Sequence, residues 1–144
     1  MEKFEIRQLS VFLEDKQGEL TEVTSILMEE NIDIKSLLLV DSTDFGILRL
    51  IVNDADKAKL VLNQKGYAVK ENRLFAVKAE DKAGSFNNVV KVLCREEVDI
   101  VYTYAFSEKG TAVFLFKVGD GDFQKAIKSL QDNQIELIDQ EFVL

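Results

Sequence analysis

Pairs of carboxylates are the residues of this chain whose types come closest to those of a catalytic site. Glu29 with Glu30, and Asp120 with Asp122, are near enough in sequence to share acid–base work. Both pairs fall at predicted helix ends, where solvent-exposed charge is the usual arrangement. We therefore expect no catalytic residues and no enzyme activity.

Histidine and cysteine chemistry is almost absent from the chain. There is no histidine, which removes the most common general base and metal ligand and disfavours zinc sites and Ser–His triads. The single cysteine, Cys94, cannot form an internal disulfide, and we interpret it as a small helix residue. We expect neither a metal nor a cofactor.

The composition is that of an acidic globular protein. Of the 144 residues, 47% are hydrophobic and 31% are charged, with a net charge of −8 that divides evenly between residues 1–70 and 71–144. Neither half offers the basic surface that nucleic acids need. No apolar run approaches the roughly 18 residues of a membrane span, and the N-terminus lacks the apolar core of a signal peptide. We therefore expect a cytoplasmic protein without membrane or nucleic-acid partners.

An internal repeat organises the chain. Residues 14–34 return 66 positions later as residues 80–100, with nine identities in 21 ungapped positions. The turn residues Asp15 and Gly18 recur in this way as Asp81 and Gly84. A repeat of this length indicates two related units, which we assign to residues 1–70 and 71–144, each near the lower size limit of an independent domain.

Each repeat predicts a strand, a turn and then a helix with one buried stripe. The stripe is Leu20, Val23 and Leu27 in the first copy. Turn residues and apolar patterns extend this order over the whole chain. The predicted strands are 4–13, 34–40, 45–52, 67–69, 73–79, 98–106, 111–118 and 135–143, and the predicted helices are 18–31, 54–66, 85–95 and 122–132.

This order predicts an α+β fold of two tandem ferredoxin-like βαββαβ units. Each unit should be a four-stranded antiparallel sheet with two helices on one face. Residues 37–40 (LLLV) and 113–118 (VFLFKV) are almost continuously apolar, whereas a sheet with one solvated face alternates. Both sheet faces must then be largely covered, and we expect a homodimer or a larger assembly.

The two turns resemble those of the ACT domain family. Its members carry Asp-Lys-Pro-Gly-x-Leu at the first strand-to-helix turn, then an amphipathic helix, then Asn-Ile at the start of the second strand. Residues 15–34, DKQGELTEVTSILMEENIDI, match this pattern well, and residues 81–100, DKAGSFNNVVKVLCREEVDI, match it less closely. The resemblance covers the whole chain as two ACT-like units with no catalytic domain attached.

Two departures from the family pattern affect the turn and the start of the second strand. Gln17 and Ala83 replace the proline, which changes only the rigidity of the turn. Asp33 and Asp99 replace the asparagine, which could alter the preference for a ligand.

The resemblance implies a regulatory module that binds a small molecule, most often an amino acid, at contacts between ACT units. A glycine in the turn lets the ligand approach the backbone, and the helix N-terminus offers N–H groups to an α-carboxylate. A nearby aspartate could hold the α-amino group, although helix capping explains these aspartates equally well. The candidate ligand-binding residues are Asp15, Gln17, Gly18, Glu19, Leu20, Asp33, Asp81, Ala83, Gly84, Ser85, Phe86, Asn88 and Asp99.

The two turns differ in their side-chain donors. The second turn is followed by Ser85, Asn87 and Asn88, whereas the first is followed by acidic residues such as Glu19. If a single turn binds the ligand, we expect it to be the second.

Two other functions compete with ligand sensing. Residues 109–116, KGTAVFLF, are similar to a strand of the RNA-recognition motif. Thr111 and Val113, however, stand where aromatic residues would stack on bases, and the acidic surface would repel phosphate. The remaining alternative is a structural dimerisation module without a ligand, which the loss of both turn prolines favours slightly.

Overall fold

The structure, a computed structural model, describes residues 3–41 and 44–143. They form two compact units, which are residues 7–72 (the first unit) and residues 73–143 together with residues 3–6 (the second unit). The predicted boundary between residues 70 and 71 lies within one continuous strand, β4 (Val69–Glu80). That each unit is a separate domain stays a prediction.

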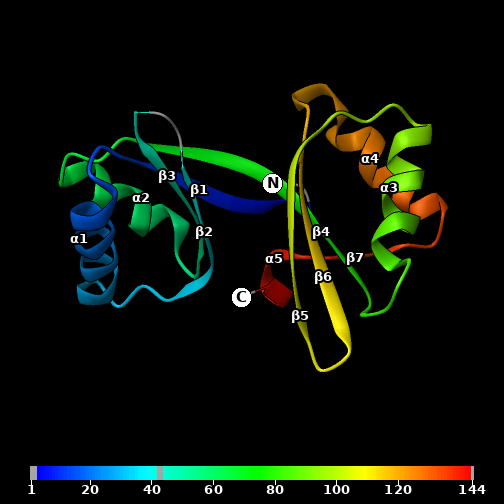
Figure 1. The fold of residues 1–144 in the computed structure, drawn as a ribbon, viewed down its shortest axis with the longest axis horizontal. Coiled ribbons are helices and arrows are strands. Elements are labelled where there is room, and N and C mark those ends of the chain that lie inside the picture. Colours follow the sequence, from blue (N-terminus) through cyan, green and yellow to red (C-terminus); the bar gives the residue numbers. More distant parts are fainter. Residues whose placement is uncertain (1–2, 42–43, 144) are drawn as a thin grey trace. The chain divides into compact units, whose positions relative to one another are not determined.

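The first unit has the predicted βαββαβ order. Its strands are hydrogen-bonded in the order β2-β3-β1-β4, and β3 is antiparallel to both β1 and β2. Two helices cover one face of these strands (Figure 1). Its elements are β1 (Ile6–Leu13), α1 (Lys16–Glu29), β2 (Ile34–Asp41), β3 (Gly46–Val52), α2 (Ala55–Gln64) and the start of β4.

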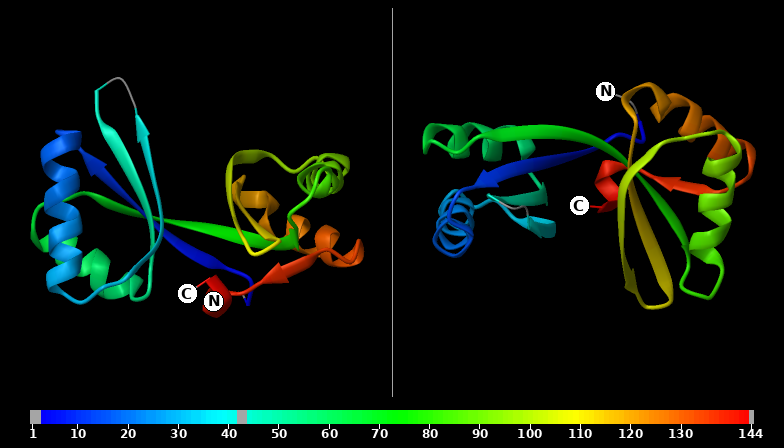
Figure 2. Two further views of the ribbon diagram at one scale, coloured as in Figure 1. Left: turned by 60° about the horizontal axis from the view of Figure 1, so that its bottom comes forward. Right: turned by 45° about the horizontal axis from the view of Figure 1, so that its top comes forward.

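The second unit repeats this arrangement with strand order β7-β4-β6-β5, in which β6 is antiparallel to both of its neighbours. Figure 2 shows its two longer helices on one side of the strands in both views. The predicted α+β fold of two tandem ferredoxin-like units is confirmed. Its elements are the rest of β4, α3 (Ser85–Arg95), β5 (Ile100–Glu108), β6 (Thr111–Val118), η1 (Asp120–Asp122), α4 (Phe123–Asp132), β7 (Glu136–Ile138) and α5 (Gln140–Val143).

Two predicted strand assignments differ from the structure. The strands predicted over residues 67–69 and 73–79 are parts of β4, because the residues between them include no glycine or proline to start a turn. The strand predicted over residues 135–143 ends at Ile138 and is followed by helix α5. Asp139, a residue type common just before helices, separates the two elements.

Each unit has its own hydrophobic core between the sheet and its two helices. In the first unit, Leu9 and Val11 of β1 are fully buried against Val23 and Leu27 of α1 and Leu62 of α2. The core of the second unit is richer in aromatic rings. Phe75 stacks on Phe116 at 5.4 Å between ring centroids and meets the Phe123 ring edge-on at 5.9 Å.

The sheet face opposite the helices is covered at the central strands. Ile51 and Leu115 are fully buried there, and the Asn72 side chain donates a hydrogen bond of 2.7 Å to the buried Ser10 hydroxyl. The last strand of the second unit differs, since Phe106 of β5, which pairs with Val113 on this face, is 41% exposed. The expected coverage is therefore confirmed only for the central strands.

Candidate functional site

The start of α1 is capped by the chain's own carboxylates. Asp15, at the N-cap, accepts a hydrogen bond of 3.4 Å from the Gly18 backbone N–H. The Glu19 carboxylate accepts from the backbone N–H groups of Glu14 and Asp15, each at 3.1 Å. These two negative charges satisfy several backbone donors and oppose a second anion at the first turn.

The start of α3 is built differently although the turn sequence is repeated. Helix α3 begins at Ser85, and the N-cap residue is Gly84, which has a left-handed backbone with φ of 92°. Glycine has no side chain with which to cap a helix. The Asp81 backbone N–H donates to the Gly110 carbonyl at 2.9 Å, so this aspartate closes the β4–α3 turn against the β5–β6 hairpin.

The aspartates that precede β2 and β5 do not join these turns within a unit. Helix α1 separates Asp15 from Asp33, and its 14 residues span about 20 Å. The Asp33 carboxylate pairs with the Lys35 ammonium at 2.6 Å. Asp99, beyond the far end of α3, donates its backbone N–H to the Asp122 carboxylate at 2.8 Å. Neither aspartate therefore completes a site with the turn of its own unit.

The apolar candidates contribute to packing. Leu20 is partly buried against the first core. The Phe86 ring lies 5.1 Å from Phe114 and stacks on Phe116 at 5.9 Å, so it extends the aromatic core of the second unit. The remaining candidates lie on the surface, with Gln17, Ala83 and Asn88 exposed and Ser85 half-buried.

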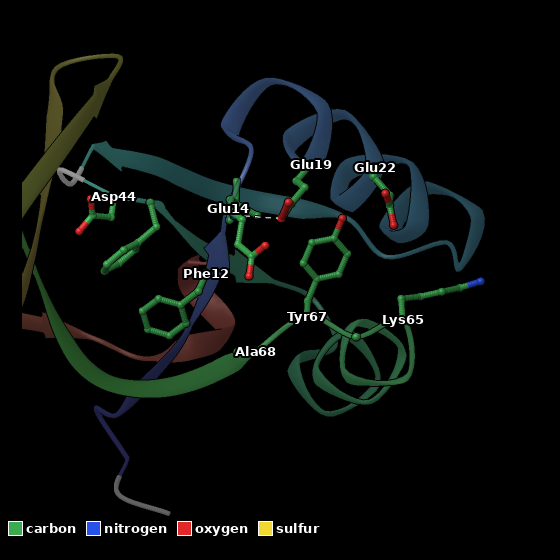
Figure 3. Close-up of a pocket in the computed structure, with 11 residues that line it drawn as sticks. Phe12, Glu14, Glu19, Glu22, Asp44, Lys65, Tyr67 and Ala68 are labelled. Atoms are coloured by element: carbon green, nitrogen blue, oxygen red, sulfur yellow. Dashed lines mark hydrogen bonds between the residues drawn. The ribbon is translucent and has the colours of Figure 1, made fainter.

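A cavity of about 580 Å³ lies beside the first turn, within the first unit. Its wall combines aromatic rings with carboxylates, and Figure 3 shows the Glu14 carboxylate and the Tyr67 ring pointing toward one another. Glu19 is the one predicted ligand-binding residue among the described residues that line it. Those residues are Phe12, Leu13, Glu14, Glu19, Glu22, Asp44, Phe45, Lys65, Gly66, Tyr67 and Ala68.

Tyr67 is the most buried polar side chain of this wall, with 9% of its surface exposed. Its hydroxyl lies between the carboxylates of Glu19 and Glu22 (Figure 3). Burial, a hydrogen bond to Glu22 and the nearby negative charges raise the pKa of Tyr67 to about 12. The hydroxyl is thus held neutral as a hydrogen-bond donor.

Backbone hydrogen bonds set the position of this wall. The Tyr67 N–H donates to the Leu62 carbonyl at 3.0 Å, which closes the end of α2, and the Phe12 N–H donates to the Ala68 carbonyl at 3.1 Å. The Phe12 ring in turn lies 5.9 Å from the Phe45 ring at the start of β3. The cavity therefore assembles from four separate stretches of sequence.

The sequence analysis missed Phe12, Phe45 and Tyr67 as site residues. They belong to no short motif, because Phe12 lies in β1, Phe45 just before β3, and Tyr67 between α2 and β4. The comparison of the two repeats favours the second turn for its side-chain donors, although Glu19 and Glu22, which follow the first turn, are the residues that line this wall.

This arrangement of paired βαββαβ units can be compared with known proteins. The sequence profile of the ACT domain pair matches residues 4–143. The chain belongs to this family. Comparison with curated protein sequences found no significant match.

Solved structures extend the comparison of this ACT domain pair. A Bacteroides thetaiotaomicron protein, BT0572, is similar with a TM-score of 0.91 and 34% identity, covering 97% of this chain and 96% of its own. The regulatory subunit of aspartate kinase from Thermus thermophilus is similar with a TM-score of 0.62 and 11% identity, covering 88% and 91%. A structure of aspartokinase alpha and beta subunits is similar with a TM-score of 0.63 and 14% identity, covering 91% of this chain and 93% of its own. The last two show a shared fold.

Two further properties of the ACT domain pair bear on its chemistry. Among residues 3–41 and 44–143, no group of three or more aspartate, glutamate or cysteine side chains is placed to hold a metal ion. Within the same residues, none of the helices is long and apolar enough to cross a membrane.

Proposed function

We propose that this ACT domain pair is a cytoplasmic regulatory protein that senses a small molecule, an amino acid, without catalysing a reaction. One observation carries the proposal, namely the cavity of about 580 Å³ beside the first strand-to-helix turn. Its volume lies within the range of small-molecule sites in proteins. The family resemblance points to the same turn, and an aromatic and polar wall suits a compact ligand with an apolar part.

The two turns offer different chemistry to such a ligand. The first turn is surrounded by carboxylates, which attract an amino group. At the second turn, α3 starts after an uncapped glycine, which leaves its N-terminal N–H groups better suited to a carboxylate. A homodimer that brings first and second turns of different copies together would supply both halves of an amino-acid site.

A thermal-shift screen of the full chain against the twenty amino acids tests the proposal. A ligand at a hundred times its dissociation constant adds about 2.7 kcal/mol, which raises the melting temperature by several degrees. We expect one amino acid, or a few related ones, to produce this shift. If none of the twenty does, the chain is better described as a structural dimerisation module.

A further inference from the structure

We infer that the cavity beside the first turn selects a ligand with an ammonium group at the end of an aliphatic chain. Basic amino acids and diamines share this chemistry. The inference rests on the proposed function, since it names the ligand class for the same cavity. It depends on the charge of the wall, on its aromatic rings and on a comparison of the two repeats.

The charge of the wall is strongly one-sided. The described lining residues include four carboxylates, of Glu14, Glu19, Glu22 and Asp44, and one cation, Lys65. The Lys65 side chain points away from the other labelled residues in Figure 3. The adjacent helix start repels an anion, because the Asp15 carboxylate accepts from the Gly18 N–H and the Glu19 carboxylate accepts from the Asp15 N–H, which places two negative charges there. The net negative charge of this wall attracts a cation.

The aromatic part of the wall suits the rest of such a ligand. The rings of Phe12 and Phe45 lie 5.9 Å apart and tilt by 57° to one another, and Phe45 is 37% exposed. Methylene groups can pack against these rings, and ring faces attract ammonium groups. Tyr67 adds a third ring, which is held in place by burial and by its hydrogen bond to Glu22.

The second repeat shows that the fold does not require this wall. The second unit has the same order of elements, and Ile135 occupies the position of Tyr67, since both donate their N–H to the carbonyl five residues earlier. Four acidic or aromatic residues of the first cavity are replaced in the second unit, whereas Glu14 is retained as Glu80. The replacements are Glu19 by Ser85, Glu22 by Asn88, Phe45 by Thr111 and Tyr67 by Ile135.

An organic cation fits this wall better than a metal ion does. No three carboxylates within residues 3–41 and 44–143 are gathered closely enough to coordinate a metal. The Glu19 carboxylate is bound to two backbone N–H groups and the Glu22 carboxylate to the Tyr67 hydroxyl. Such spaced and oriented carboxylates can surround an ammonium group, which donates three hydrogen bonds in diverging directions.

Calorimetric titration of the full chain with three related compounds tests the inference. L-lysine carries the side-chain ammonium and the α-carboxylate, norleucine keeps the α-ammonium and α-carboxylate but lacks the side-chain ammonium, and cadaverine keeps two ammonium groups but lacks the α-carboxylate. We expect norleucine to bind at least about tenfold more weakly than the better of the other two, because a hydrogen bond to a charged group is lost. Equal binding of lysine and cadaverine would identify a diamine-type site, and preference for lysine a basic amino-acid site.

Matched variants locate the binding. The Glu14→Gln/Glu22→Gln double variant keeps the shape of the wall but removes two charges. We expect its affinity for the tighter-binding of lysine and cadaverine to be at least about tenfold lower than that of the parent. Glu80→Gln, which changes the equivalent of Glu14 in the second repeat, should leave the affinity within about twofold. Circular dichroism would verify that both variants fold.

The outcomes separate this inference from the proposed function. If an uncharged or acidic amino acid binds and neither lysine nor cadaverine does, the inference is wrong and the proposed function stands. It is also overturned if norleucine binds as tightly as the better of lysine and cadaverine, or if the double variant binds like the parent. If no amino acid and no diamine binds, both fail.

Discussion

Gly18 and Gly84 are equivalent in the repeat but have different roles in the backbone. Gly18 lies inside α1, and a Cβ added there would be 3.1 Å from an Asp15 carboxylate oxygen. Gly84 precedes α3 with a φ of 92°, and a Cβ there would meet nothing within 4 Å. A side chain at residue 18 is therefore limited by the available space, whereas a side chain at residue 84 is limited by the backbone conformation.

We predict that Gly84→Ala lowers the free energy of unfolding by about 1 kcal/mol, because an L-residue is strained in the left-handed region. Gly18→Ala should change it by less than about 0.5 kcal/mol, since better helix propensity offsets the contact with Asp15. Urea denaturation of both variants measures the difference. Equal effects would contradict the different roles assigned to the two glycines.

The raised pKa of Tyr67 predicts a change of stability at alkaline pH. Its pKa rises from 10.0 to about 12 in the folded protein, so the native state holds this proton more tightly. The resulting stabilisation is complete below pH 10 and is lost as the pH rises toward 12. We expect one of the three tyrosines to ionise late in an ultraviolet absorbance titration, and Tyr67→Phe to remove that step. A late step that persists in the variant would contradict this assignment.

At the scale of elements, the two helices that follow the turns begin differently. Helix α1 begins at residue 16 and α3 at residue 85, three positions later in terms of the repeat. The difference coincides with the replacement of Glu19 by Ser85. Glu19 reaches back to two backbone N–H groups, and a serine side chain is too short to do so.

We predict that Glu19→Ala lowers the free energy of unfolding by about 1 kcal/mol through the loss of this capping interaction. Ser85→Ala, the matched change in the second repeat, should stay within about 0.5 kcal/mol. Chemical denaturation followed by circular dichroism compares the two variants. If Ser85→Ala proves as costly as Glu19→Ala, the helix start does not depend on the glutamate.

An ion-pair cluster joins three elements of the first unit and predicts acid sensitivity. Arg7 of β1 contacts Glu71 of β4 and Asp56 at the start of α2, the latter at 2.7 Å. The Arg7 guanidinium holds the pKa of Glu71 below its usual 4.5. This contribution to stability is therefore present above pH 4.5 and is lost as the pH falls further.

We expect the melting temperature of the parent to fall more steeply between pH 5 and pH 3 than that of Arg7→Met. The variant has already lost the interaction, so protonation of Glu71 costs it less. Thermal melts across this range provide the measurement. Parallel pH profiles would mean that the cluster adds nothing, as is common for exposed ion pairs.

At the scale of the whole molecule, the strands that end the sheet order carry exposed apolar side chains. Leu37 and Leu39 of β2 are 54% and 39% exposed, and Val101 of β5 is 56% exposed. An apolar edge strand invites pairing with another chain. These strands are the surfaces through which we propose that the protein forms a homodimer.

Light scattering should therefore give a mass of at least twice the chain mass of 16.3 kDa at micromolar concentration. The Leu37→Lys/Leu39→Lys variant should weaken this assembly by placing charges on the edge strand. Leu60→Lys is the control, because Leu60 is equally exposed at 57% but lies on α2. A parent species of 16.3 kDa would contradict the proposed dimer.

The sequence by itself determined the features that depend on local interactions. The repeat divided the chain into equivalent halves, and the helical spacing of Phe123, Ala126, Ile127 and Leu130 located α4 almost to the residue. The Asp-Lys-x-Gly turns identified the family. Hydrophobic periodicity and the residue preferences of turns depend on a few neighbouring residues, so they can be recognised without knowledge of the fold.

Only the tertiary structure decided which of these residues meet. It separated Asp15 from Asp33 by the length of α1, and it brought Phe12, Phe45 and Tyr67 together from distant parts of the sequence. It also merged two predicted strands into β4. The physical reason is that a cavity forms where side chains from several packed elements converge, and that convergence depends on sheet order and on long-range packing, which short patterns do not encode.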